Sequence, residues 1–374
     1  MSAGSLKALL HGKRVLVLCG AGGVGKTTTA AALGVAAARA GRKVLVLTID
    51  PARRLAEAMG LPESGPEPTA VPPERLFTDG PPGPGRLDVW MLDPALVFER
   101  MVHRLAPSPE AARTIVEHRV FRFLSELVAG VQEYAATEAL DGFLADGHYE
   151  LIVLDTPPSR HALDFLEAPG RLTRFLDERI VSLFGPEEPS RRGRLWQGAQ
   201  ALVGRVLDGI FGAASARELR GFVGAFGGLF GGIRLHTERL RARLASPESA
   251  FLLVTSPEST ALREATFFRD ALVKQGLPFA GYVLNRSWAR EDALHHPETL
   301  LEHVSGDAHA EHAVAALSRL ADAEAARAES HRAILARLTE HLPQGAVAVA
   351  APEGGAELEE FSGLVRLGEA LAGA

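Results

Sequence analysis

Short, mostly hydrophobic runs recur along the chain. Four of them occupy 15–19, 44–49, 151–154 and 251–254. Runs of this length that do not alternate regularly with polar residues are typical of strands buried on both faces of a parallel sheet. An alanine-rich segment from Thr27 to Ala40, which Gly41 follows, predicts a helix between the first two strands.

Strands that alternate with helices predict an α/β fold with a doubly wound, mostly parallel sheet. Two long stretches with helical periodicity interrupt this order, and we interpret them as an α-helical subdomain inserted between sheet strands. The predicted segments, in chain order, are core 1–93, helical insert 94–146, core 147–171, helical insert 172–247 and core 248–374, the last with a helical stretch at 289–340.

A proline-rich segment and an alternating segment follow the second strand. Eight of the 23 prolines lie between residues 62 and 84, which predicts a surface loop because proline lacks an N–H donor and has a fixed φ. Leu87, Val89 and Met91 then occupy every second position, as in a strand that buries only one face.

The composition narrows the function classes. With 374 residues, 40 Lys and Arg against 46 Asp and Glu, and a net charge of −6, the chain is not suited to holding nucleic acid or anionic lipid. A single cysteine, Cys19, excludes an internal disulfide and a four-cysteine zinc site. The sequence has neither a signal-peptide pattern nor an apolar run of about 18 residues. We therefore expect a cytoplasmic protein with no nucleic-acid partner and no stable membrane insertion.

A phosphate-binding pattern lies between the first predicted strand and helix. The segment Gly20-Ala21-Gly22-Gly23-Val24-Gly25-Lys26-Thr27 fits G-x-x-x-x-G-K-[ST]. Its glycines allow backbone N–H groups to surround phosphate oxygens, Lys26 reaches the β- and γ-phosphates, and the Thr27 hydroxyl binds Mg²⁺. The pattern therefore predicts a site for a nucleotide and Mg²⁺.

Polar residues follow three further strands. Asp50 can orient or deprotonate an attacking water, or can simply cap a helix that begins at Pro51. Asp155 is the expected second group near Mg²⁺, directly or through water. Asn285 and Arg286 stand where a side-chain amide could read a nucleotide base, although Asn at a strand end is usually a turn residue.

These segments resemble one family of ATPases. The loop 20–28, the switch segments 48–52 and 155–163, and the segment 283–286 occur in the order found in the ArsA family, whose phosphate-binding loops are of the deviant Walker type. The resemblance covers about 14–60, 148–170 and 250–288, and Pro352-Glu353 resembles the late base-flanking loop. The family includes the arsenite-pump ATPase and the GET-pathway ATPase that carries tail-anchored membrane proteins.

The resemblance implies a sheet of the P-loop NTPase type, ATP hydrolysis with Mg²⁺, and two subunits that face each other across the nucleotides. The absence of a guanine-reading N-K-x-D segment also favours ATP. The resemblance implies that Lys26, Thr27 and Thr28 bind phosphate and Mg²⁺ and that Asp50 positions the attacking water. It also implies that switch II begins at Asp155 and that the nucleotide base is contacted by Asn285, Arg286 and Pro352.

The chain departs from the family at Ala21, where relatives carry a second lysine that reaches the phosphates of the partner subunit. We hypothesise that Arg53, Arg54 or Arg160 substitutes for it, or that a paralogous subunit supplies the lysine; slow turnover is the alternative. No paired C-x-x-C motif is present, so no zinc is expected. The histidine run from His295 to His312 is interpreted as a solvated helix face.

The second half of the helical insert is rich in glycine. It holds 11 of the 38 glycines between residues 193 and 232, where Phe222, Phe226 and Phe230 recur at a spacing of four. One interpretation is close helix packing inside the insert. The other is a mobile hydrophobic groove that receives an apolar client helix when ATP closes the dimer.

Together these observations predict a dimeric Mg-ATP-dependent switch, either a homodimer or a heterodimer with a paralogue. It would couple ATP binding and hydrolysis to the binding of a hydrophobic protein segment, as in membrane-protein targeting. One alternative is a MinD/ParA-like positioning ATPase that associates with membrane or DNA. The acidic segment 354–374 is unsuited to binding anionic lipid. The other is a nucleotide-binding regulatory subunit with little turnover.

Overall fold

The computed structural model describes residues 5–48, 59–61, 65–78, 80–118, 121, 131–156, 229–290, 308–340, 342–353 and 360–373. The chain divides into two compact units. The sheet unit comprises the described residues of 1–91, 150–160 and 245–374, and the helical unit comprises those of 92–149 and 161–244.

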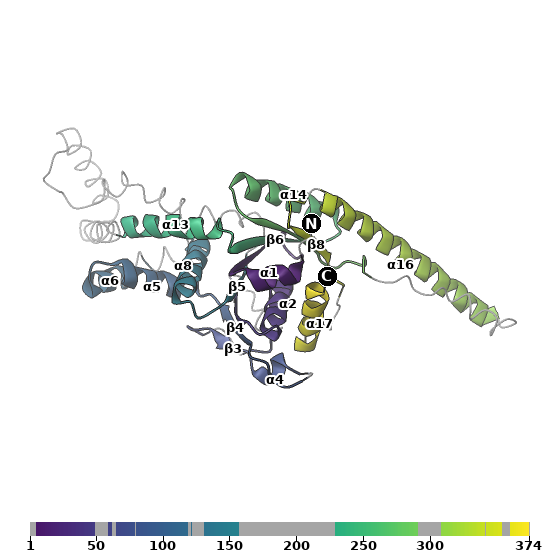
Figure 1. The fold of residues 1–374 in the computed structure, drawn as a ribbon, viewed down its shortest axis with the longest axis horizontal. Coiled ribbons are helices and arrows are strands. Elements are labelled where there is room, and N and C mark those ends of the chain that lie inside the picture. The colour runs from purple at the N-terminus through teal and green to yellow at the C-terminus, as the bar shows by residue number, and fades with distance from the viewer. Residues whose placement is uncertain are drawn as a thin grey trace, which may run out of the picture. The chain divides into compact units, whose positions relative to one another are not determined.

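An eight-stranded sheet forms the centre of the sheet unit (Figure 1). Its spatial order is β3-β4-β2-β5-β1-β6-β7-β8, and all pairs are parallel except β3 with β4. The predicted α/β fold with a mostly parallel sheet is therefore confirmed. The strands are β1 (Val15–Cys19), β2 (Lys43–Thr48), β3 (Thr69–Ala70), β4 (Arg86–Met91), β5 (Leu151–Asp155), β6 (Ser249–Thr255), β7 (Phe279–Leu284) and β8 (Val347–Ala350).

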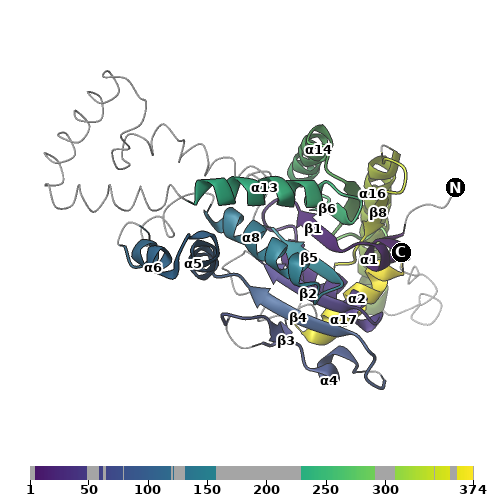
Figure 2. The same ribbon diagram turned by 60° about the vertical axis from the view of Figure 1, so that its left-hand side comes forward.

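The central strands are buried along their whole length because helices cover both faces of the sheet. Helix α2 packs on one face with α1 and α17, and α14 lies on the other face (Figures 1 and 2). This explains the uninterrupted hydrophobic runs of β1, β5 and β6. The described helices of the unit are α1 (Leu6–Gly12), α2 (Lys26–Arg39), α4 (Pro73–Leu76), α14 (Ser259–Lys274), α16 (Ala308–Glu340) and α17 (Phe361–Ala372).

Small residues allow α2 to lie close to its neighbours on both sides. A Cβ atom on Gly34 would lie 2.3 Å from Cγ2 of Val46 in β2. On the opposite side, a Cβ atom on Gly368 of α17 would lie 2.5 Å from the carbonyl oxygen of Ala32. The alanine-rich composition of α2 is thus a packing requirement, and it fixes the helix whose first turn follows the phosphate-binding pattern.

The described part of the helical unit consists of four helices, three of which are joined by a partly buried ionic cluster. Glu138 of α8 pairs with Arg104 of α5, and its Oε2 atom lies 2.9 Å from Nε2 of His236 in α13. The other ring nitrogen of His236 lies 3.4 Å from Asp141. Burial lowers the pKa of His236; Asp141 opposes this shift, and nearby arginines add to it. The helices are α5 (Pro94–Leu105), α6 (Pro109–Val116), α8 (Val131–Asp146) and α13 (Phe230–Leu244).

Strand β4 differs from its sequence prediction. Leu87 and Val89 are buried as expected, but Asp88 and Trp90 on the opposite face are also only 2% and 3% exposed. The prediction of one buried face is wrong because the second face is also covered, and the Trp90 indole on that face donates to the Gly65 carbonyl oxygen at 3.2 Å. An ion pair with Arg86, at 2.8 Å, offsets part of the free-energy cost of burying the Asp88 carboxylate.

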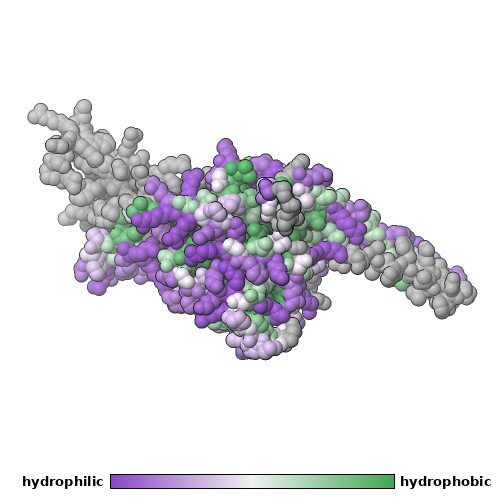
Figure 3. Space-filling model, in the orientation of Figure 1, coloured by the Kyte–Doolittle hydropathy of each residue, from purple (hydrophilic) through white to green (hydrophobic). Residues whose placement is uncertain are grey.

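The proline-rich segment is also more regular than predicted. The described part of 62–84 includes β3 and the short helix α4, in which Pro73 occupies the first turn. None of the described helices contains an apolar stretch long enough to cross a bilayer. Hydrophilic residues predominate on the face shown in Figure 3, and hydrophobic ones are scattered among them.

Candidate nucleotide-binding site

The phosphate-binding pattern forms the loop between the carboxyl end of β1 and the start of α2. Gly25 caps the helix in the left-handed conformation, with φ of 88°, and no side chain caps the first turn. A Cβ atom on Gly25 would lie 2.2 Å from Nδ2 of Asn285, and one on Gly20 would lie 2.1 Å from the carbonyl oxygen of Val254. Neither position has room for a Cβ atom, so glycine is required there by these close neighbours as well as by the backbone conformation.

Lys26 is held against this loop. Its side chain is only 7% exposed, and its Nζ atom donates to the carbonyl oxygens of Gly20 at 3.1 Å and Ala21 at 2.9 Å. A buried ammonium group at the uncapped start of a 14-residue helix makes this end of the loop strongly electropositive. Such an arrangement attracts an anion with several acceptor oxygens, such as a polyphosphate.

Asp155 ends β5 and receives two hydroxyl groups. Its Oδ2 atom accepts hydrogen bonds from Oγ1 of Thr27 at 2.6 Å and from Oγ1 of Thr48 at 3.0 Å. The carboxylate is fully buried, and it is brought to Thr48 because β5 pairs with β2 in the register Thr48↔Asp155. A hydroxyl and a carboxylate of this kind are the hard oxygen ligands that Mg²⁺ prefers. Thr28 follows in the first turn of α2.

The residues proposed to contact the base lie after β7 and β8. The Asn285 amide is buried and donates to the carbonyl oxygen of Val24 at 2.8 Å, so here it supports the phosphate-binding loop. Arg286 is exposed and adopts a positive φ of 54°. The Ser287 N–H donates to the Ala351 carbonyl at 2.9 Å, which brings Pro352 beside the loop that follows β7.

An aromatic cluster next to these loops did not enter the sequence predictions. The Trp288 indole donates to Glu353 at 2.8 Å, and its backbone N–H donates to Nδ1 of His331 in α16 at 3.0 Å. Arg327 lies over the indole ring, 5.3 Å from its centroid. The only sequence signal was a tryptophan in a polar loop. The cluster attaches α16 to both loops of the proposed base site.

Cys19 lies at the end of β1 but is not a reactive thiol. Burial raises its pKa to about 12, while the Thr156 hydrogen bond and the charge of Lys26 lower it less strongly. Among the described residues, no group of three or more His, Cys, Asp or Glu side chains could hold a metal ion.

Several predicted site residues lie outside the described part of the chain. These are Asp50, the candidate arginines Arg53, Arg54 and Arg160, and the groove residues Phe222 and Phe226. Phe230 is the first residue of α13. Ala21, Gly22 and Gly23 are described and lie on the accessible side of the loop. The roles of all these residues stay predictions.

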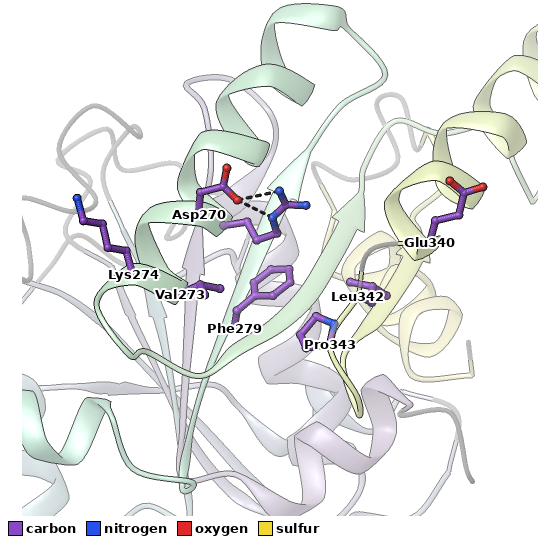
Figure 4. Close-up of a pocket in the computed structure, with 8 residues that line it drawn as sticks. Asp270, Val273, Lys274, Phe279, Glu340, Leu342 and Pro343 are labelled. Atoms are coloured by element: carbon purple, nitrogen blue, oxygen red, sulfur yellow. Dashed lines mark hydrogen bonds and ion pairs between the residues drawn. The ribbon is translucent and has the colours of Figure 1, made fainter.

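A pocket lies at the other end of the parallel strands from the phosphate-binding loop (Figure 4). Phe279, the first residue of β7, contributes to its lining together with Leu342 and Pro343. Arg269 and Asp270 of α14 also line it, and their side chains pair with each other at 2.7 Å. The parallel strand β7 separates this pocket from Asn285, which follows the other end of the strand, so the pocket is not part of the nucleotide site.

Comparison with known sequences points to one family. Residues 13–185 match the profile of the anion-transporting ATPases (ArsA). A protein of Halobacterium salinarum named "Putative arsenical pump-driving ATPase" is 32% identical over 189 residues, which are 48% of this chain and 27% of that protein.

Two eukaryotic proteins are similar as well. An ATPase ASNA1 homolog of Entamoeba dispar is 30% identical over 180 residues, or 45% of this chain and 50% of the relative. An ATPase GET3 of Malassezia globosa is 26% identical over 271 residues, or 72% of each chain. The chain thus spans half or less of the length of the Halobacterium and Entamoeba relatives.

Proposed function

We propose that this chain, whose residues 13–185 match the ArsA profile of anion-transporting ATPases, is a Mg-ATP-dependent ATPase switch of that family. The observation that carries the proposal is the arrangement of Lys26 and Thr27 at one helix start. A buried ammonium group stands beside a hydroxyl that is already bonded to a buried carboxylate.

The loop residues fit Mg-ATP by their chemistry. Lys26 would exchange its two loop carbonyls for phosphate oxygens and neutralise part of their charge. Thr27 donates its proton to Asp155, so its oxygen lone pairs are free to face a cation. Mg²⁺, when bound with ATP, would neutralise part of the negative charge that develops on the phosphoryl oxygens. Gly20 and Gly25 keep side chains out of the loop.

Asp50 is proposed to orient the attacking water and accept its proton. This role follows from its place two residues beyond the end of β2, whose last residue, Thr48, contacts Asp155. Replacing Asp50 with Asn should leave ATP affinity within about threefold of wild type and reduce turnover by about 100-fold or more. An Asp50→Asn variant that hydrolyses ATP at the wild-type rate would contradict this assignment.

We further propose that a dimer, formed with a second copy or a paralogue, couples the nucleotide state to binding of a hydrophobic protein segment. The support is the match to the ArsA profile and the glycine-rich pattern with Phe222, Phe226 and Phe230. Hydrogen exchange of 195–235 tests it: Mg-ATP or an apolar client helix should increase protection there. Equal exchange with and without either addition would rule out a nucleotide-dependent groove.

A regulatory subunit with little turnover is the second candidate, and Ala21 favours it. The methyl side chain of Ala21 carries no charge, whereas the family resemblance implies a lysine there. Steady-state ATP hydrolysis by wild type and Ala21→Lys separates the two functions. A large gain in turnover in the variant supports the regulatory subunit, and an already substantial wild-type rate that does not change supports the switch.

A further inference from the structure

One carboxylate oxygen joins the phosphate-binding loop to the end of a strand that the pattern does not include. Oδ2 of Asp155 accepts both the Thr27 hydroxyl at 2.6 Å and the Thr48 hydroxyl at 3.0 Å. Thr48 is the last residue of β2 and lies directly opposite Asp155 in the sheet register. Both side chains are inaccessible, with exposures of 1% for Thr48 and 0% for Asp155. The contact therefore lies in an environment where a hydrogen bond to a charge is strong.

The direction of these hydrogen bonds decides whether the Thr27 oxygen can bind a cation. A hydroxyl that donates its proton to a carboxylate turns its oxygen lone pairs away from that carboxylate. The Thr27 oxygen is thus available as a ligand only while Asp155 keeps its Oδ2 atom in the present position. A carboxylate can rotate about two side-chain bonds, and each additional donor to the same oxygen restricts that rotation. Thr48 is such a donor, and it comes from a different element.

We propose that Thr48 is a positioning residue for the magnesium site. Its hydroxyl holds Asp155 in the orientation in which Asp155 accepts the proton of Thr27, and so it sets the geometry of the Thr27 oxygen toward Mg²⁺. The inference rests on the proposed function, because it assigns Thr48 a role in the same Mg-ATP site. Since Thr48 precedes Asp50 by two residues, the same bond also joins the segment of the proposed water-positioning carboxylate to the metal site.

Thr48 could instead serve only to satisfy a buried carboxylate. The two roles differ in what a substitution changes. A purely structural role lowers the stability of the sheet unit but leaves the metal dependence of nucleotide binding unaltered in molecules that remain folded. A positioning role weakens the Mg²⁺ dependence specifically, and a serine that restores the hydroxyl restores it.

The test compares Thr48→Val with Thr48→Ser and with the control Thr255→Val. Thr255 ends strand β6 of the same sheet and is fully buried like Thr48, but its hydroxyl lies 3.4 Å from the Ser256 carbonyl oxygen instead of contacting Asp155. For each protein, the Mg²⁺ concentration that half-saturates binding of a fluorescent ATP analogue is measured. Affinity for the analogue in EDTA and binding of Mn²⁺ with ATP, followed by electron paramagnetic resonance, are measured in parallel.

We expect Thr48→Val to raise the half-saturating Mg²⁺ concentration and the Mn²⁺ dissociation constant about tenfold, with the affinity in EDTA unchanged within about twofold. Thr48→Ser and Thr255→Val should stay within about twofold of wild type. Wild-type metal dependence in Thr48→Val, or an equal loss in Thr255→Val, would overturn the inference.

A third replacement guards against a folding defect. If Thr48→Val does not fold, Thr48→Cys, which keeps one γ atom but donates poorly, must show the same selective loss. If wild type itself binds no ATP analogue with Mg²⁺, the proposed function fails together with the inference. Binding by wild type with no selective loss in the Thr48 variants refutes the inference alone.

Discussion

The side-chain amide of Asn285 donates a 2.8 Å hydrogen bond to the carbonyl oxygen of Val24, which lies 261 positions earlier in the phosphate-binding loop. A Cβ atom on Gly25 would lie only 2.2 Å from the same amide nitrogen. The loop is thus shaped from outside by the residue that follows β7, as well as by its own glycines. Such support restricts the conformations of the loop before any ligand binds, which lowers the entropy lost on binding.

The first prediction concerns Gly25. Replacing Gly25 with Ala should lower the free energy of unfolding of the sheet unit by about 3 kcal/mol, because strain at positive φ adds to the clash with Asn285. Gly345→Ala is the matched control. Gly345 has a similar φ of 83°, and no atom lies within 4 Å of the position that its Cβ atom would take, so only about 1 kcal/mol of backbone strain is expected there.

A double variant isolates the clash. In an Asn285→Ala background, the additional cost of Gly25→Ala should fall to about the cost of Gly345→Ala, because the amide that blocks the Cβ position has been removed. Denaturant unfolding followed by far-UV circular dichroism gives these free energies. Equal costs of Gly25→Ala with and without the Asn285 side chain would show that the two residues do not interact as described.

Part of this site could be predicted from the sequence and part could not. The glycines, Lys26 and Thr27 are neighbours in the chain, so their shared function is visible as a local pattern. The runs of β1 and β5 are equally readable because both strands are buried on two faces. These features depend on local conformation and burial alone.

The contacts of Asn285 and Thr48 depend instead on the order of strands in the sheet. Thr48 meets Asp155 because β2 neighbours β5, and Asn285 reaches Val24 because β7 lies two strands from β1. No local pattern encodes those neighbours. The burial of Asp88 in β4 was missed for a related reason, since other segments of the chain, and not the period of the strand's own sequence, determine whether each face is covered.

The second prediction concerns the ionic cluster of the helical unit. Glu138→Ala should destabilise the unit by about 2 kcal/mol, because it leaves Arg104 and His236 without their shared carboxylate. Glu99→Ala is the control: Glu99 pairs with His103 at 4.0 Å on the surface of α5, and its loss should cost less than about 0.5 kcal/mol.

Amide hydrogen exchange of α8 and α13 measures this difference without requiring the two units to unfold together. Glu138→Ala should accelerate exchange in both helices by about tenfold or more, while Glu99→Ala should leave them unchanged. Equal exchange in wild type and Glu138→Ala would contradict a stabilising role for the cluster.

The third prediction is a pH dependence at His331. Burial and the charge of Arg327 lower the pKa of His331, whereas Glu353 opposes them. Its Nδ1 atom accepts the Trp288 N–H, so the neutral ring is the form that the folded protein favours. The stability from this contact is complete above the ordinary histidine pKa of about 6.5 and decreases as the pH falls below it, because the unfolded chain then binds the proton more readily.

His331→Gln keeps an acceptor in this region but removes the titration. Urea unfolding at pH 7.5 and pH 5.5 should therefore show a larger loss of stability on acidification for wild type than for His331→Gln. The same loss in both proteins, or a larger loss in the variant, would show that His331 does not favour its neutral form in the fold.

The central claim, that the loop from Gly20 to Thr27 binds Mg-ATP through Lys26, is tested most directly by measuring ATP affinity in Lys26→Ala. Lys43→Ala, which removes an exposed lysine from the start of β2, is the control for the loss of one positive charge. Isothermal titration of the three proteins with ATP and Mg²⁺ gives the dissociation constants. We predict that Lys26→Ala weakens binding by about 100-fold or more and that Lys43→Ala stays within about twofold of wild type. Wild-type affinity in Lys26→Ala would contradict the account.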